Sequence, residues 1–204
     1  MLRRRAASAI GVLFSGVLLS LVVAWSIFGE TSEAANEITC YILFGATSFL
    51  ALALLGKGAF KQSTPLTFHA AQLPFAILAG VLGFGVSWAY VSVLTLALSP
   101  EGGPEVEAMT PTFVLSAVIL APLVEEWMDR GILWNATRRI TGVPMTILVT
   151  SALFALSHGL AGFFLALPHR FVGGLILGTL RARSGSLLPG MLAHAIWNLL
   201  AVTV

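Results

Sequence analysis

The segment 125–130, with the sequence EEWMDR, carries three acids and one arginine inside a hydrophobic stretch that runs from residue 113 to residue 134. A charged side chain at the centre of a bilayer costs about 3 kcal/mol on insertion scales and about 10 kcal/mol or more in simulations. Such charges therefore persist where they pair, line a wet cavity or do chemistry. Glu126 and Arg130 are four residues apart, so they share a helix face and can pair. Glu125 lies about 100° further round the helix, which suits this carboxylate to a different task, such as general-base catalysis.

Two other apolar segments carry polar residues at helical spacing. His158 follows Phe154 by four residues, and Asn198 follows His194 by four, so each pair shares one helix face. An imidazole and a carboxamide that converge on one small group can donate hydrogen bonds to a developing oxyanion. Together with Glu125, these residues predict a site that combines a general base with an oxyanion hole.

Each of these polar groups also has a purely structural interpretation. An ion pair between Glu126 and Arg130 can hold helices together, and a histidine in a span often makes an interhelical hydrogen bond of about 0.6–2 kcal/mol. Asn198 can be an interfacial residue. Polar groups at helical spacing on three separate segments are harder to explain in this way, which favours a shared functional site.

The composition indicates the elements that must position these residues. Of the 204 residues, 57% are hydrophobic and 10% are charged, against about 25% charged in a typical soluble domain. A spanning helix needs about 20 apolar residues. The sequence thus predicts an all-α, polytopic transmembrane helix bundle of about seven spans, with a polar cavity among the C-terminal four helices. The predicted spans are residues 6–28, 38–56, 71–99, 111–135, 143–160, 163–181 and 185–204.

The charged residues outside the segment 125–130 alternate between loops. Basic residues precede the first predicted span or follow the second, fourth and sixth: Arg3, Arg4, Arg5, Lys57, Lys61, Arg138, Arg139, Arg181 and Arg183. The acids lie in the other loops: Glu30, Glu33, Glu37, Glu101, Glu105 and Glu107. By the positive-inside rule we expect a cytoplasmic N-terminus and an external C-terminus in an inner or plasma membrane. The basic residues do not cluster on a soluble region of the chain, so we expect no nucleic-acid partner.

Two basic regions have their own interpretation. The first span has a basic start like a signal peptide, but its apolar run exceeds the roughly 7–15 residues of a signal h-region, so we interpret it as an uncleaved span.

His169 and Arg170 lie early in the sixth span, and Arg170 fits no cytoplasmic loop. They line the cavity or contact lipid headgroups, and headgroup contact is the favoured interpretation.

Three motifs, in this order, resemble those of the CPBP family: Glu-Glu-x-x-x-Arg at 125–130, Phe-x-x-x-His at 154–158 and His-x-x-x-Asn at 194–198. This family comprises the type II CAAX prenyl endopeptidases and the bacteriocin-processing or self-immunity membrane proteins, also called Abi proteins. The resemblance covers residues 111–204, which we interpret as a catalytic core. Residues 1–110 resemble the family only as three generic N-terminal transmembrane helices of the same integral membrane domain.

The resemblance implies an intramembrane endopeptidase that hydrolyses a peptide bond in a membrane-associated or lipidated protein. In the family, the residue that matches Glu125 activates a water with help from the one that matches His158. The residues that match His194 and Asn198 form the oxyanion hole. The expected partners are then the lipid bilayer and a peptide or lipidated protein substrate. The substrate's identity and the oligomeric state are open.

The resemblance also implies that Glu126 and Arg130 support the site without reacting. The residue before this arginine is usually aromatic in the family, but here it is Asp129. Asp129 follows Glu125 by four residues, which predicts a third acid on the Glu125 face. It competes for Arg130, changes the protonation of Glu125 or faces cytoplasmic water, and these three alternatives stay open.

Glu125, His158 and His194 are suitable zinc ligands by residue type. An open zinc site takes three protein ligands and a water, which would use both histidines and the proposed base, and the sequence lacks a His-Glu-x-x-His motif. We therefore expect no metal cofactor, with zinc as the less favoured alternative. Cys40 is the single cysteine, so no intramolecular disulfide is possible.

Two other function classes fit the same residues. A non-catalytic membrane protein, such as an immunity or scaffold factor, would use the cavity to bind a partner. A proton-coupled transporter would use the carboxylates as a relay. Many transporters contain internal repeats, and none is visible in the sequence, which makes this class the weakest of the three.

Overall fold

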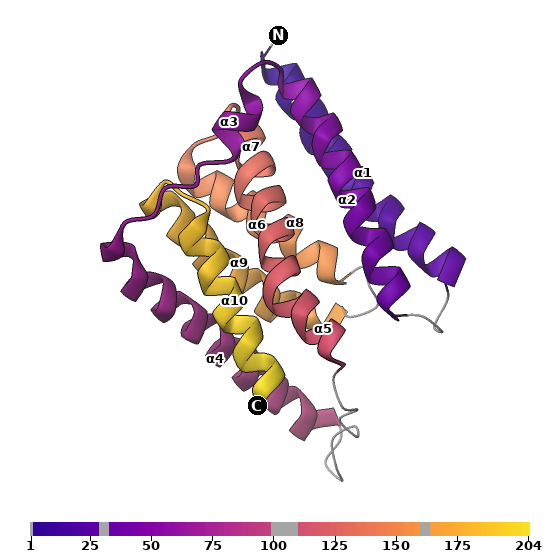
Figure 1. Cartoon of the computed structure of the whole chain (residues 1–204), viewed down its shortest axis with the longest axis vertical. Helices are drawn as coiled ribbons and strands as arrows, with labels where there is room; N and C mark the ends of the chain where they lie inside the picture. The colour runs from indigo at the N-terminus through magenta and orange to yellow at the C-terminus, as the bar shows by residue number, and fades with distance from the viewer. Residues whose placement is uncertain (1, 29–32, 99–109, 160–163) are drawn as a thin grey trace.

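The computed structural model describes residues 2–28, 33–98, 110–159 and 164–204, and every regular element in these ranges is a helix (Figure 1). The all-α prediction is thus confirmed for the described residues. The long helices are α1 (Leu2–Phe28), α2 (Glu33–Leu55), α4 (Leu73–Leu98), α8 (Val143–Gly159), α9 (Leu167–Ser184) and α10 (Leu188–Thr203). The short ones are α3 (Ala59–Ser63), η1 (Ala70–Gln72) and η4 (Phe164–Ala166).

One further continuous helix, Pro111–Arg138, carries the segment 125–130, and we call it the motif helix. Its parts are α5 (Pro111–Leu115), the π-helical η2 (Ser116–Leu120), α6 (Ala121–Glu126), the π-helical η3 (Trp127–Leu133) and α7 (Trp134–Arg138). It lies in the middle of the molecule (Figure 1). Its C-terminal part contacts α1, α2 and α3, and its N-terminal part contacts α10.

Two clusters of buried apolar residues hold the long helices together. The first joins α1 and α2 to the motif helix and includes Ala9, Leu52 and Ile132. The second joins α4, α9 and α10 and includes Leu177 and Trp197. The motif helix is therefore the element at which the N-terminal helix pair meets the C-terminal group.

Pro122 accounts for the first π-helical segment of the motif helix. Proline has no amide hydrogen, and its ring clashes with the carbonyl four residues earlier in a regular α-helix. The segment η2 lies just before Pro122, where a wider turn relieves this clash. The amide of Ala121 donates to the carbonyl of Ser116, five residues back, and so skips the carbonyl of Ala117.

The second π-helical segment, η3, skips a carbonyl in the same way. The amide of Trp134 donates to the carbonyls of Asp129 and Gly131 and passes over that of Arg130. Single π-helical turns inside α-helices are rare and occur frequently at functional sites. Each of the two segments therefore leaves one carbonyl available to a side chain from another helix.

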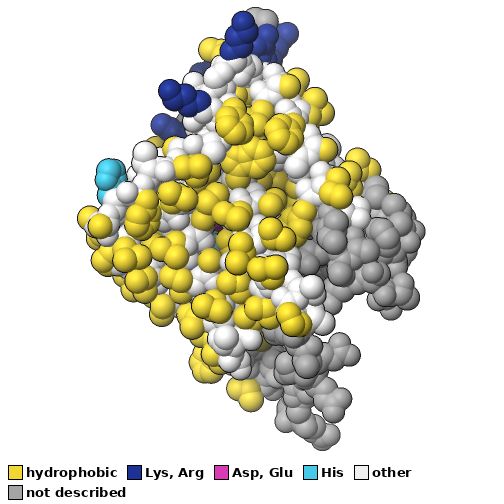
Figure 2. All heavy atoms as spheres, viewed as in Figure 1, with side chains coloured by type: hydrophobic (Ala, Val, Ile, Leu, Met, Phe, Trp, Pro, Cys, Tyr) yellow, Lys and Arg dark blue, Asp and Glu magenta, His cyan; other side chains and the backbone are white. Residues whose placement is uncertain are grey.

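The surface of the molecule is rich in exposed apolar side chains. Ala70–Leu98 and Pro111–Arg138 are long and apolar enough to cross a membrane by length and composition, and α2, α8 and α10 contribute shorter apolar stretches. Trp88 and Leu96 of α4 are exposed, and hydrophobic side chains cover much of the face in Figure 2. Long helices follow the seven predicted segments, but the number of them that span a bilayer and the division at residue 110 stay predictions.

Lys and Arg side chains gather at the end of the molecule that holds the N-terminus, and the C-terminus lies at the opposite end (Figure 1 and Figure 2). This distribution agrees with the positive-inside pattern. The predicted acidic loops fall largely on residues 29–32 and 99–109, outside the described residues. The orientation of the chain in a membrane therefore stays a prediction.

Candidate active site

Three helices bring the carboxylate of Glu125 between two imidazoles. Glu125 lies near the end of α6, His158 in the last turn of α8 and His194 in the middle of α10. The Glu125 Oε2 atom is 3.7 Å from His158 Nε2 and 3.9 Å from His194 Nε2. The side chains of Glu125 and His158 are 15% and 24% exposed, whereas that of His194 is 1% exposed. The structure thus gathers a carboxylate and two imidazoles that lie far apart in the sequence.

The contacts of His158 determine which ring nitrogen faces the glutamate as an acceptor. Nδ1 lies 2.8 Å from the carbonyl oxygen of Phe154, which can only accept, so Nδ1 carries a hydrogen. In the neutral ring, Nε2 then has a lone pair that faces Glu125. Two acceptors cannot form a hydrogen bond with each other, but atoms 3.7 Å apart suit a bridging water that donates to both. The Glu125 Oε2 atom is buried and has no hydrogen-bond partner among the described residues.

Glu126 lies beside this group and is fully buried. Its Oε1 atom accepts a hydrogen bond from Arg130 Nη1 at 2.9 Å and lies 3.4 Å from His194 Nδ1. Arg130, also fully buried, donates from Nη2 to the carbonyl of Gly174 in α9 at 3.3 Å. The ion pair expected from the spacing of Glu126 and Arg130 is therefore present, and it connects the motif helix to α9 and α10.

Phe154 fills the centre of this cluster. Its ring is fully buried, with its centroid 4.6 Å from that of His158 and 5.9 Å from that of His194. The Arg130 guanidinium lies over the same ring at 4.5 Å, a distance typical of a cation–π contact. The aromatic residue of the second motif therefore holds both imidazoles and the arginine in position.

The two skipped carbonyls of the motif helix accept hydrogen bonds from other helices. Asn198 Nδ2 in α10 donates to the carbonyl of Ala117 at 2.7 Å, and Arg181 Nε in α9 donates to the carbonyl of Arg130 at 3.0 Å. A buried polar group without a partner costs about 1–3 kcal/mol, so these contacts stabilise the π-helical segments. The structure thus shows Asn198 connecting two helices, and its place in an oxyanion hole stays a prediction.

Two basic residues make contacts that the sequence did not predict. Arg181, expected at the cytoplasmic end of the sixth span, is 8% exposed, and its guanidinium lies 5.5 Å from the ring centroid of Trp134. Arg170, for which headgroup contact is the favoured expectation, is half-buried, and its guanidinium lies over the Trp197 ring of α10 at 5.6 Å. The sequence signal for Arg170 was its misfit to the loop charges, because a half-buried cation packed against another helix has no reason to follow the positive-inside pattern. Nothing in the sequence distinguishes Arg181 from a loop cation.

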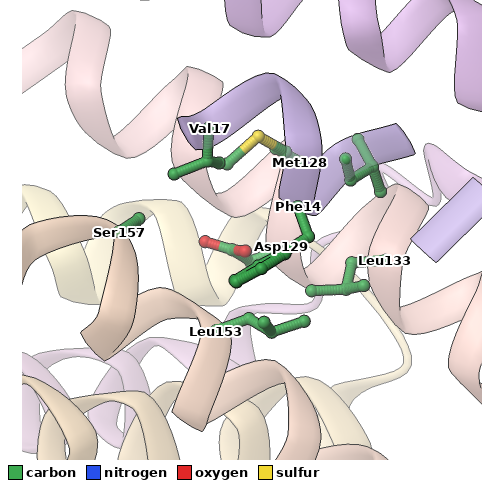
Figure 3. A pocket seen from close by; sticks show the side chains of 8 residues that line it. Phe14, Val17, Met128, Asp129, Leu133, Leu153 and Ser157 are labelled. Carbon is green, nitrogen blue, oxygen red and sulfur yellow. The ribbon is translucent and has the colours of Figure 1, made fainter. Parts of the chain in front are cut away.

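Asp129 lies in a small cavity between α1, η3 and α8 (Figure 3). The cavity has a volume of about 20 Å³, enough for one water molecule, and its walls include Phe14, Leu133 and Leu153. Asp129 is 3% exposed, and its Oδ2 atom, which has no hydrogen-bond partner among the described residues, lies 3.7 Å from Arg130 Nη1. The structure therefore excludes exposure to cytoplasmic water and shows at most weak competition for Arg130.

Metal binding is a separate question for this site. In the part of the chain that the structure describes, no group of three or more His, Cys, Asp and Glu side chains is arranged to hold a metal ion. The metal-free interpretation and the polar cavity around the site stay predictions, and a chelator can test the first of them.

Comparison with known proteins agrees with the motifs. Residues 107–200 match the family model described as Type II CAAX prenyl endopeptidase Rce1-like, a range that contains all three motifs. An uncharacterized 24.3 kDa protein of Escherichia coli is 41% identical over 83 residues, which make up 40% of this chain and 38% of that protein. No solved structure matches the chain significantly. With its apolar helices, the chain is a membrane protein whose residues 107–200 are similar to the type II CAAX prenyl endopeptidases, which confirms the resemblance to the CPBP family.

Proposed function

We propose that the protein is an intramembrane endopeptidase that cleaves a peptide bond in a membrane-associated or lipidated protein. The observation that carries the proposal is the buried, unpartnered Oε2 atom of Glu125, 3.7 Å and 3.9 Å from the Nε2 atoms of His158 and His194. A carboxylate beside an imidazole acceptor suits general-base activation of a water. The match of residues 107–200 to an endopeptidase family supports hydrolysis over a purely binding role.

The reaction begins with a water that donates hydrogen bonds to Glu125 Oε2 and His158 Nε2. Glu125 takes a proton as the water oxygen attacks the scissile carbonyl carbon, and the carbonyl π electrons move to the carbonyl oxygen. When the tetrahedral intermediate collapses, the C–N bond breaks and the leaving amine receives the proton from Glu125. Proton transfer by a positioned side chain contributes about 10²–10⁴-fold to a rate.

His194 and Asn198 are the proposed donors to the oxyanion of this intermediate. Nδ1 of His194 lies 3.4 Å from Glu126 Oε1, and this placement of the ring directs its Nε2 atom toward Glu125 and the proposed oxyanion position. Asn198 uses one amide hydrogen on the carbonyl of Ala117 and has a second hydrogen for the oxyanion. The hydrogen bond to Ala117 then fixes the direction in which the second amide hydrogen of Asn198 points.

The proposal is tested with the full chain in liposomes. The probes are a prenylated CAAX peptide, the same peptide without its prenyl group and a bacteriocin-precursor peptide, with cleavage followed by mass spectrometry. Glu125→Ala and His194→Ala are expected to abolish cleavage, whereas His69→Ala, which removes an exposed histidine outside the site, leaves it unchanged. Circular dichroism confirms the fold of each variant. Cleavage that persists in both site variants would contradict the catalytic assignment. A biological activity that persists although neither the wild type nor any variant cleaves a probe peptide would favour a binding role.

A further inference from the structure

A groove of about 660 Å³ runs between α4 and α9, on a part of the molecule that the proposed active site does not use. Its volume lies within the range of about 300–1,000 Å³ typical of small-molecule sites. Its walls are mostly apolar and include Phe75, Leu78 and Leu82 from α4 and Leu175 and Ile176 from α9. The groove thus offers a long hydrophobic surface between two helices.

One end of the groove is polar. Gln72 of η1 and Ser184 and Arg183 of α9 line it there. Gln72 Nε2 donates to the carbonyl of Ser184 at 3.3 Å, and Gln72 Oε1 accepts from the backbone amide of His69 at 3.2 Å. The side-chain amide of Gln72 thus closes the end of the groove. Arg183 is exposed and makes no ion pair with a carboxylate of the described residues. The polar end of the groove therefore presents an arginine that has no carboxylate partner among the described residues.

These features select the chemistry of the occupant. A peptide in the groove would bring backbone amides and carbonyls against apolar walls, where each unsatisfied group costs several kcal/mol. An acyl chain has no such groups, and a phosphate at its head matches Arg183 in charge. Basic pockets between helices on the cytoplasmic side are a recurrent form of anionic lipid site.

We propose that the α4–α9 groove binds an anionic phospholipid, with an acyl chain along the apolar walls and the phosphate at Arg183. The same groove includes Ala79 and Leu180, which belong to the buried cluster around Trp197. A lipid seated there bridges α4 and α9 and stabilises the C-terminal helix group. This site is independent of the proposed peptidase chemistry.

The test uses the full chain in a neutral detergent and native mass spectrometry with phosphatidylglycerol, phosphatidylcholine of the same acyl chains, and inorganic phosphate. Phosphatidylglycerol is expected to bind preferentially and to raise the unfolding temperature, and phosphate alone is expected not to. Arg183→Gln should weaken phosphatidylglycerol binding about fivefold, because one basic residue near an anionic lipid contributes about that factor. Leu175→Trp, which fills the groove, should weaken binding of both lipids.

The matched control is Lys57→Gln, which removes an exposed cation outside the groove. It is expected to leave phosphatidylglycerol binding unchanged. Equal weakening by Lys57→Gln and Arg183→Gln would show non-specific attraction to the basic end of the molecule and overturn the proposal. Equal binding of the two lipids, or binding of phosphate alone, would overturn it as well. Cleavage activity is not a readout, so failure here is distinct from failure of the proposed peptidase.

Discussion

The surroundings of Glu126 and of Asp129 differ, although both residues are buried acids three positions apart on the motif helix. Glu126 accepts from Arg130 at 2.9 Å and has His194 at 3.4 Å. Asp129 faces a cavity with largely apolar walls and has Arg130 at the longer distance of 3.7 Å (Figure 3). A buried charge is stable only where partners replace the lost hydration. The presence of close partners, rather than burial alone, therefore distinguishes Glu126 from Asp129.

The difference arises from the helices that face each acid. On the Glu126 side, α10 approaches closely at Gly190, where an added Cβ would lie 2.9 Å from Glu126 Oε2. On the Asp129 side, α1 contributes Phe14 and Val17 to the cavity wall. The glycine leaves room for the partners of Glu126, whereas apolar side chains surround the carboxyl group of Asp129.

Arg130→Met is expected to have the largest effect on stability. It leaves Glu126 buried without its ion-pair partner, and breaking a buried pair in this way costs about 3–5 kcal/mol. Chemical unfolding in detergent, followed by circular dichroism, measures the loss. The matched control Arg138→Met, at an exposed arginine of the same helix, should change stability by less than about 0.5 kcal/mol. An Arg130→Met variant as stable as the wild type would contradict the distinction drawn between Glu126 and Asp129.

Asn198→Ala is expected to have the next largest effect. It leaves the skipped carbonyl of Ala117 without its donor, which costs about 1–3 kcal/mol. Unfolding measurements and cleavage assays are compared with Thr203→Ala, which removes an exposed hydroxyl that bonds only within its own helix. Unchanged stability would mean that the Ala117 contact does not hold α10 to the motif helix.

Asp129→Asn is expected to change little. The substitution keeps the shape of the side chain and replaces a carboxyl group whose partner is distant, so the stability should stay within about 1 kcal/mol of the wild type or rise. The same unfolding assay measures it. A loss as large as that of Arg130→Met would place Asp129 in the same network as Glu126 and end the distinction between the two acids.

The smallest expected effect is that of a chelator. Because a water held by Glu125 and His158 needs no metal, cleavage should proceed at the same rate after dialysis against EDTA. Loss of cleavage, with recovery on addition of Zn²⁺, would instead make Glu125 and the two histidines metal ligands.

Local spacing predicted those features that depend on one helix or on an ordered set of motifs. The Glu126–Arg130 pair follows from the four-residue repeat, and the helical segments follow from apolar stretches of spanning length. The meeting of Glu125 with both imidazoles was expected from three motifs that require one common site.

The sequence did not predict the features that depend on contacts between distant segments. Pro122 is a local cause of the first π-helical segment, but no pattern pairs the carbonyl of Ala117 with Asn198. Arg181 resembles a loop cation because its burial depends on the skipped carbonyl of Arg130, which exists only in the folded chain. The cavity around Asp129 is likewise formed by α1, far away in the sequence.

The most direct test of the account compares Glu125→Gln with Asp129→Asn in cleavage of one membrane-anchored peptide by the full chain in liposomes. Both substitutions remove one acid of the motif helix and keep the shape of its side chain. Glu125→Gln is expected to lower the cleavage rate by about 10²–10⁴-fold, whereas Asp129→Asn is expected to stay within a few-fold of the wild type. Equal losses in the two variants, or normal cleavage by Glu125→Gln, would contradict the assignment of Glu125 as the base.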